Sequence, residues 1–109
     1  MEIQKKKIVY KVLVKASYTS ILIGELAKII KQNGYDIGQN KLFYWLRENG
    51  YLTKIGQRRN LPTQKAMELD LFEIEQKIIE KTDGKKKIVM TTKVTQKGQK
   101  YFINKFLSK

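Results

Sequence analysis

The segment from Gly24 to Leu52 constrains the fold more than any other part of the sequence. It holds two short amphipathic stretches, at about 24–33 and 38–49, which are separated by one tight turn. Each stretch is followed by a glycine, Gly34 or Gly50, and glycine takes the left-handed conformation that ends a helix at no steric cost. The layout predicts a helix-turn-helix, a motif whose second helix usually enters the major groove of DNA.

The apolar positions of both stretches recur at the spacing of three and four residues that builds one face of a helix. They are Leu26, Ala27, Ile29 and Ile30 in the first stretch, and Leu42, Trp45 and Leu46 in the second. Projection of the second stretch at about 100° per residue leaves a polar arc facing outward. We define this polar arc as Asn40, Lys41, Tyr44 and Arg47, with Gln39 and Phe43 at its margins.

The residues before the helix pair give mixed signals. Ile8 to Ala16 fits a helical face, but its β-branched residues and its alternation also fit a strand. We expect a helix there, inside a lead-in segment (1–19) whose first seven residues are frayed and solvated. Ser20 to Ile23 is expected to be an edge strand or a lead-in.

The second half of the chain reads as strands, turns and one more helix. We expect a strand at 51–53, a basic hairpin tip or wing at 54–60, and a short turn within 63–69. Strands at 71–79 and 87–94 form a hairpin around Asp83-Gly84, which is a strong turn signal. Thr95 is the expected N-cap of the last helix. The apolar face of that helix uses Tyr101, Phe102, Phe106 and Leu107. The predicted fold is one α+β domain over 1–109, a winged-helix-like helix-turn-helix with a β-hairpin and a C-terminal helix.

The excess of basic residues indicates an anionic partner, with solubility alone as the alternative explanation. The chain has 23 Lys and Arg against 10 Asp and Glu, a net charge of +13, which favours nucleic acid, an anionic membrane or an acidic protein face. Acidic residues are absent between Glu2 and Glu25, between Glu48 and Glu68, and after Asp83. This segregation along the sequence predicts a basic face opposed to an acidic one.

The residue types that the chain lacks exclude several kinds of chemistry. It has no cysteine and no histidine, which removes disulfides, thiolate nucleophiles and zinc sites built from these residues. Glu73 and Glu75 share a strand face, but no third metal ligand accompanies them at a suitable spacing. We expect a binding protein that is not an enzyme, without a cofactor and without a membrane-spanning segment.

The predicted DNA contacts lie on the second helix and directly after it. Asn side chains bind adenine edges and Arg side chains bind guanine edges, while Lys and Tyr suit phosphate or base contacts. The predicted set is Asn40, Lys41, Tyr44, Arg47, Lys54, Arg58, Arg59, Gln64 and Lys65. The alternatives are a solvated helix face, a mobile surface loop, and amides of Asn60 and Gln64 that cap neighbouring backbone. Glu48 lies near the polar arc and would repel phosphate.

Five sequence blocks resemble the C-terminal domain of phage antirepressors, the KilA C-terminal family. The resemblance covers roughly residues 20 to 107 and rests on ordered blocks at family-like spacing. These blocks are Gly24–Lys28, Gln32–Gly34, Leu42–Leu52, Asn60–Gln64 and Thr95–Gln99.

The resemblance implies a DNA-binding domain of a phage or prophage regulator that relieves repression of lytic genes in the cytoplasm of the bacterial host. In that family the domain commonly follows a separate N-terminal domain. The implied partner is double-stranded DNA, or alternatively a phage repressor protein that is inactivated by direct contact. A homodimer is also possible, because operators are often palindromic.

Overall fold

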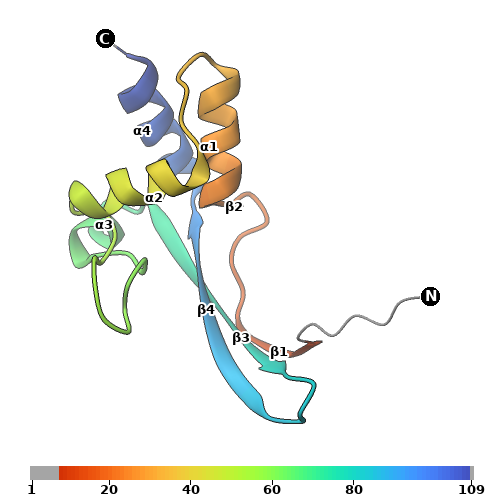
Figure 1. The fold of residues 1–109 in the computed structure, drawn as a ribbon. Coiled ribbons are helices and arrows are strands. Elements are labelled where there is room, and N and C mark those ends of the chain that lie inside the picture. Colours follow the sequence, from red (N-terminus) through yellow and green to blue (C-terminus); the bar gives the residue numbers. More distant parts are fainter. Residues whose placement is uncertain (1–7, 109) are drawn as a thin grey trace.

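The computed structural model describes residues 8 to 108, which form an α+β fold (Figure 1). The elements, in chain order, are β1 (Ile8–Val14), β2 (Ile21–Leu22), α1 (Ile23–Gln32), α2 (Gln39–Glu48), α3 (Gln64–Glu68), β3 (Phe72–Glu80), β4 (Lys86–Val94) and α4 (Gln96–Leu107). Helices α1, α2 and α4 gather at one end of the molecule, and the β3–β4 hairpin projects away from them. The predicted α+β class is confirmed. No helix in the described part of the chain is long and apolar enough to cross a bilayer.

The sheet has four antiparallel strands in the order β1-β3-β4-β2. Strands β3 and β4 pair without a register shift from Phe72 opposite Val94 to Glu80 opposite Lys86. Their turn contains Gly84 at φ 86°, and the backbone N–H of Lys85 donates to the Asp83 carboxylate at 2.9 Å. The predicted hairpin around Asp83-Gly84 is therefore confirmed. The two-residue strand β2 confirms the edge strand expected within 20–23.

The helix expected at 8–16 is wrong, because residues 8–14 form strand β1. This strand pairs antiparallel with β3, from Ile8 opposite Glu80 to Val14 opposite Gln76, with two register shifts. The physical reason is tertiary: β3 offers an unpaired edge, and β-branched residues fit a pleated surface better than a helix. The frayed segment predicted for 1–7 lies outside the described residues.

The helix pair follows the sequence prediction closely. Helix α1 begins one residue before the predicted start, and the Glu25 carboxylate accepts from the backbone N–H of Leu22 at 2.8 Å. This contact satisfies one of the donors that a helix start leaves free. Gly34 and Gly50, which follow the two helices, have φ of 111° and 81°. Both glycines therefore end their helices in the left-handed region, as the sequence predicts.

The core lies between α1, α2, α4 and the helix-proximal end of the sheet. The ring of Phe102 in α4 is fully buried, with its centroid 5.1 Å from that of Tyr51 and 5.6 Å from that of Phe72. Leu42 and Leu46 of α2 are also fully buried, and Leu26 and Ile30 of α1 face them within the same cluster. The apolar stripes predicted from helical spacing thus form this core, except that Ile29 and Trp45 are only half-buried.

Helix α4 is capped and closely packed where it leaves β4. The Thr95 hydroxyl accepts from the backbone N–H of Gly98 at 2.9 Å, which confirms the predicted N-cap. The same hydroxyl donates to the carbonyl of Asp70 at 2.6 Å, and the Thr95 N–H donates to the carbonyl of Leu71 at 3.0 Å. The start of α4 is thereby fixed against the segment that leads into β3.

We predict that Gly98→Ala destabilises the protein by about 1–3 kcal/mol, the usual range for overpacking. A Cβ at this position would collide with the backbone carbonyl of Leu71 and would lie 2.9 Å from Val94 Cγ1. Gly24→Ala is the matched control, because the atoms close to its Cβ belong to the flexible Gln39 side chain. Urea unfolding followed by circular dichroism measures both, and equal stabilities of the two variants would contradict the packing argument.

We also predict a stability loss at high pH that depends on Tyr51. Burial and the hydrogen bond with the Tyr101 hydroxyl, 2.7 Å away, raise the pKa of Tyr51 from 10.0 to about 12. Because the folded-state pKa is above the unfolded one, this contribution is complete below pH 10 and is lost as the pH rises towards 12. Near-ultraviolet titration should show that Tyr101→Phe lowers the pKa of Tyr51. An unchanged pKa in that variant would exclude the hydrogen bond as a cause.

Candidate nucleic-acid interface

Helix α2 presents most of the polar arc to solvent. Asn40 and Lys41 are exposed, and the side chain of Tyr44 is 60% exposed. The opposite face of the helix holds Leu42 and Leu46, which are fully buried. Burial of that face therefore fixes the direction in which the first two turns of the polar arc point.

Arg47, the fourth residue of the polar arc, is turned towards the loop that follows α2. Its guanidinium Nη1 donates to Asn60 Oδ1 at 2.8 Å, and the side chain is half-buried. A guanidinium has five N–H donors, so one bond to Asn60 leaves others for a ligand. Arg47 thus links the last turn of α2 to this loop.

We call the segment 53–61, which follows α2, the basic loop. Its ends are joined by two backbone bonds: Thr53 N–H to Leu61 at 2.8 Å, and Asn60 N–H to Thr53 at 2.9 Å. The strand predicted at 51–53 is not formed, because this part of the chain makes only the isolated bridge between Leu52 and Pro62. Proline has no N–H to extend a ladder, which limits the pairing at this point.

Asn60 holds the basic loop against two other elements. Its backbone is in the left-handed region, at φ 68°, which asparagine tolerates better than most residues. Its side chain accepts from Arg47 of α2, and its carbonyl accepts from the Thr92 hydroxyl of β4 at 2.7 Å. The sequence points to Asn60 as an amide that caps neighbouring backbone and as part of the Asn60–Gln64 block. It gives no signal for Thr92, which lies far away in the chain.

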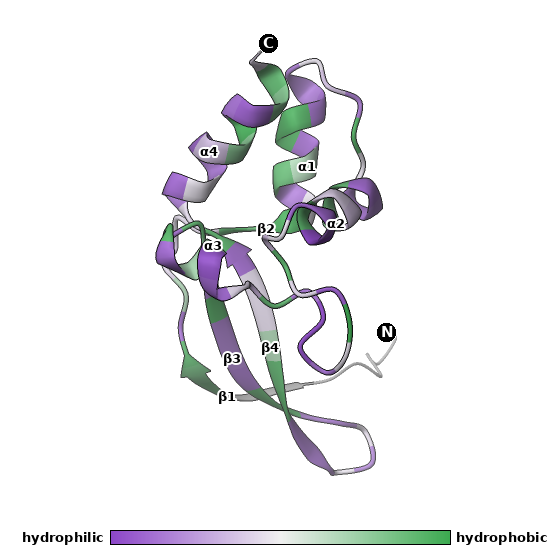
Figure 2. Cartoon of the chain, turned by 90° about the vertical axis from the view of Figure 1, so that its left-hand side faces the viewer, coloured by the Kyte–Doolittle hydropathy of each residue, from purple (hydrophilic) through white to green (hydrophobic). Residues whose placement is uncertain are grey.

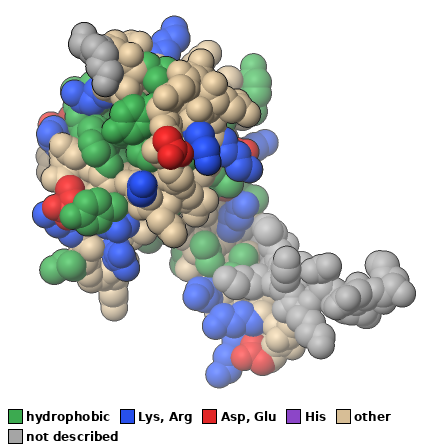
Figure 3. All heavy atoms as spheres, turned by 45° about the horizontal axis from the view of Figure 1, so that its top comes forward, with side chains coloured by type: hydrophobic (Ala, Val, Ile, Leu, Met, Phe, Trp, Pro, Cys, Tyr) green, Lys and Arg blue, Asp and Glu red, His purple; other side chains and the backbone are tan. Residues whose placement is uncertain are grey.

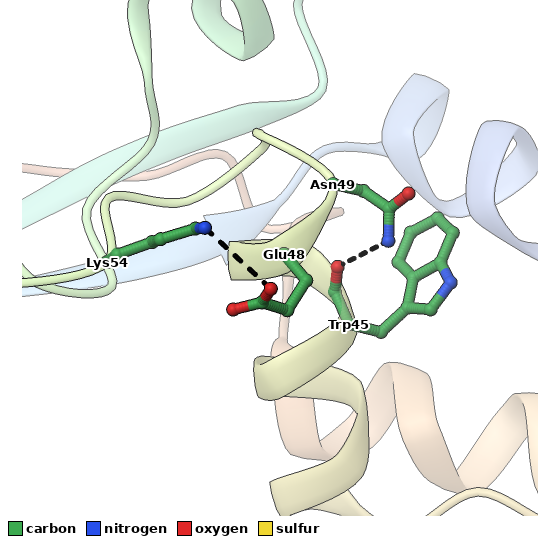
Figure 4. A network of polar contacts seen from close by, with 4 residues as sticks. All are labelled: Trp45, Glu48, Asn49 and Lys54. Atoms are coloured by element: carbon green, nitrogen blue, oxygen red, sulfur yellow. Dashed lines mark hydrogen bonds and ion pairs between the residues drawn. The ribbon is translucent and has the colours of Figure 1, made fainter.

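The cations of the basic loop differ in their surroundings. Lys54 Nζ lies 3.7 Å from a carboxylate oxygen of Glu48 at the end of α2 (Figure 4). Both side chains are about half exposed, so this ion pair is weak and lets Lys54 exchange partners. Arg58 and Arg59 are exposed. The loop therefore carries its predicted cations beside the C-terminal turns of α2.

Gln64 and Lys65 follow the basic loop and make contacts within the chain. Both lie in α3, where Gln64 Nε2 donates to the Glu68 carboxylate at 3.1 Å. Lys65 Nζ lies 5.0 Å from the centre of the Tyr51 ring, a cation–π contact. The contact of Gln64 with Glu68 follows from helical spacing, whereas that of Lys65 with Tyr51 depends on the tertiary structure. Both side chains are exposed, and their contact with DNA stays a prediction.

The predicted separation of a basic face from an acidic face is wrong for the hairpin. Strand pairing sets Glu73 opposite Lys93 and Glu80 opposite Lys86. Figure 3 shows basic side chains over both the helical end and the projecting hairpin, with carboxylates among them. Charges that are separated along the chain become neighbours because antiparallel pairing brings distant residues together.

Two acidic residues of β3 make polar contacts within the chain. The Glu73 carboxylate accepts from the backbone N–H of Ser17 at 3.1 Å and from the Ser20 hydroxyl, while Glu75 lies 3.4 Å from Lys77 Nζ. Within residues 8–108, no group of three acidic side chains is placed to hold a metal ion. Glu73 thus anchors the segment between β1 and β2.

The fold and the site define a basic α+β domain with an exposed helix and an adjoining cationic loop. The whole chain, residues 1–109, matches the family model of the phage antirepressor protein KilAC domain, so the chain belongs to this family. This match confirms the resemblance that the sequence blocks indicate.

Two relatives from Escherichia phage P1 are longer than this chain. Protein kilA is 37% identical over 92 residues, which is 84% of this chain and 32% of the relative. Antirepressor protein 1 is 36% identical over 64 residues, which is 59% of this chain and 18% of the relative. The chain thus spans about a third or less of the length of these relatives. No solved structure matches it, so the winged-helix part of the predicted fold stays a prediction.

We predict that Asn60→Gly lowers the free energy of unfolding by about 0.5–1.5 kcal/mol, the usual net value of one hydrogen bond. Glycine keeps the left-handed backbone and removes only the amide that accepts from Arg47. Asn60→Ala should cost more, because a Cβ disfavours positive φ. Urea unfolding of Arg47→Ala, Asn60→Gly and the double variant measures the coupling, and additive losses would contradict a direct bond.

Proposed function

We propose that this chain is a duplex-DNA-binding module of a phage antirepressor, a regulator that relieves repression of lytic genes inside the bacterial host. In this proposal α2 enters the major groove and the basic loop acts as a wing on the phosphate backbone. The observation that carries it is the bond from Arg47 to Asn60, because it holds the loop with Arg58 and Arg59 beside the polar arc.

The dimensions and chemistry of α2 suit this role. Its ten residues give a length of about 15 Å, and the major groove is about 12 Å wide, enough to admit a helix. Asn40 and Tyr44 lie on the exposed side, where an amide can pair with an adenine edge and a phenol can reach a base or phosphate. Lys41, on the same side, would neutralise a phosphate.

Arg47 has a different place in this proposal from the direct base contact that sequence reasoning favours. Its bond to Asn60 orients the guanidinium at the junction of helix and loop. The remaining donors are then available for a phosphate or a guanine edge. Arg47 therefore both contacts the DNA and positions the basic loop.

Binding of the repressor protein itself is the second candidate, because the word antirepressor fits both competition for operator DNA and direct inactivation of a repressor. In that mode the basic surface docks on an acidic face of the repressor, with association that weakens in salt. Size exclusion of this chain with the cognate repressor tests it, and separate elution of the two proteins at low salt would exclude it.

For the DNA-binding proposal, we predict that Arg58→Ala with Arg59→Ala flattens the salt dependence of duplex binding. Each lost phosphate contact should change the slope of log K against log salt by about 0.9. The probe is a DNA duplex that is selected from a random pool for binding to this chain. Its binding is measured by fluorescence anisotropy. The matched control is Lys97→Ala with Lys100→Ala, which removes two exposed cations of α4.

The control pair should leave the slope nearly unchanged, and Tyr44→Ala should weaken the selected duplex more than a scrambled one. Equal effects of the loop pair and the α4 pair would show that only the net charge matters. If no duplex binds even at low salt, the proposal fails.

A further inference from the structure

The β4 strand has an open edge. On one side it pairs with β3 along its whole length, but on the other side β2 covers it only at Lys93 and Val94. From Lys87 to Thr91 no strand of the described chain pairs with that second side. Such an edge presents backbone N–H and C=O groups in a row, ready to pair with another extended chain.

This edge borders a groove of about 540 Å³. Met90 and Thr91 of β4 form one wall, Gln39 and Phe43 of α2 another, and Arg59 of the basic loop a third. Figure 2 shows the basic loop lying beside β4. Thr92 and Asn60 both line the groove, and the bond between them ties β4 to the basic loop there.

The groove offers apolar surface as well as backbone groups. Met90 and Leu22, which both line it, are each 44% exposed, and Phe43 is half-buried. Ile88 continues the apolar row along β4 and is 58% exposed. An edge strand with exposed apolar side chains is a template for strand addition, and proteins usually cover or blunt such edges.

The charge beside the groove is positive. Lys28 of α1 and Arg59 of the basic loop line it, and Lys87 lies further along β4. The one carboxylate in its wall, Glu25, is already bonded to the backbone N–H of Leu22. A second copy of this chain, with a net charge of +13, would be repelled, whereas an acidic segment would be attracted.

We propose that the open edge of β4 binds an extended acidic peptide segment of a partner protein. The segment adds a strand against Lys87–Thr91, places alternate apolar side chains in the groove, and pairs its carboxylates with Lys28 and Arg59. This is strand addition, in which backbone bonds give affinity and side-chain pockets give specificity. The site shares Arg59 with the proposed phosphate contacts, but it does not require duplex binding by α2.

A polypeptide fits this surface better than a nucleic acid strand does. Alternating N–H and C=O groups match the backbone of another extended chain, whereas phosphate oxygens only accept hydrogen bonds. The open stretch is also long enough, since strands begin at about three residues.

The test begins with selection of random 12-residue peptides, displayed on phage, against the full chain. Sequences rich in Glu and Asp, with apolar residues at alternate positions, should be enriched. One enriched peptide, synthesised with a fluorescent label, then serves as the probe in anisotropy titrations. In amide NMR spectra of the chain, this probe should shift the signals of Lys87–Thr91.

Two variants test the groove itself. Lys28→Gln should weaken the probe about twofold to fivefold, within the range of an exposed ion pair, while Lys31→Gln on the same helix should leave it unchanged. Met90→Thr keeps a residue suited to strands and should weaken the probe about tenfold by removing apolar contact. Circular dichroism checks that each variant remains folded.

Several results would overturn the proposal. These are enrichment of basic or proline-rich peptides, amide shifts away from Lys87–Thr91, and equal losses in the two lysine variants. A peptide-free dimer in sedimentation that Met90→Thr abolishes would assign the edge to a second copy instead. Amide shifts at Lys87–Thr91 caused by mixed-sequence duplex without peptide would assign the groove to nucleic acid, whereas displacement of the probe alone follows from the shared Arg59. Duplex titrations on the same samples separate this outcome from failure of the DNA-binding proposal.

Discussion

Burial of Phe102 is the interaction on which the arrangement of this domain depends. Its ring, contributed by α4, meets Tyr51 after α2, Phe72 of β3 and Trp45 of α2, with the Trp45 centroid 6.2 Å away. A large aromatic ring that is removed from water by packing against several elements contributes strongly to stability. It joins the helices to the sheet, and together with the burial of Leu42 and Leu46 it fixes which side of α2 faces the solvent.

Two kinds of contact then build the surface that we propose as functional. Apolar burial orients α2, whereas polar bonds centred on Asn60 hold the basic loop between α2 and β4. The bond of Asn60 with Thr92 also lies in the lining of the groove beside β4. A duplex-binding face and a peptide-binding edge thus share Asn60 as a supporting residue and Arg59 as a cation. They differ in that the edge of β4 also uses backbone groups.

The parts of the fold that local rules govern could be read from the sequence. The ends of α1 and α2, the Thr95 cap and the hairpin at Asp83-Gly84 agree with expectation, because each depends on neighbours a few residues apart. The candidate site was only partly predictable. The residues of the polar arc follow from helical spacing. The bond of Arg47 to Asn60 instead depends on where the basic loop lies relative to α2 in the folded structure.

By itself, the sequence determined the helix pair, the central hairpin, the apolar stripes and the excess of positive charge, since these follow from composition and short-range periodicity. Only the tertiary structure decided that residues 8–14 form a strand on β3, that acidic and basic residues face each other across the hairpin, and that Thr92 anchors the loop. The reason is physical. Strand pairing and hydrogen bonds between distant segments depend on which strand edges and which polar groups the rest of the fold leaves unpaired.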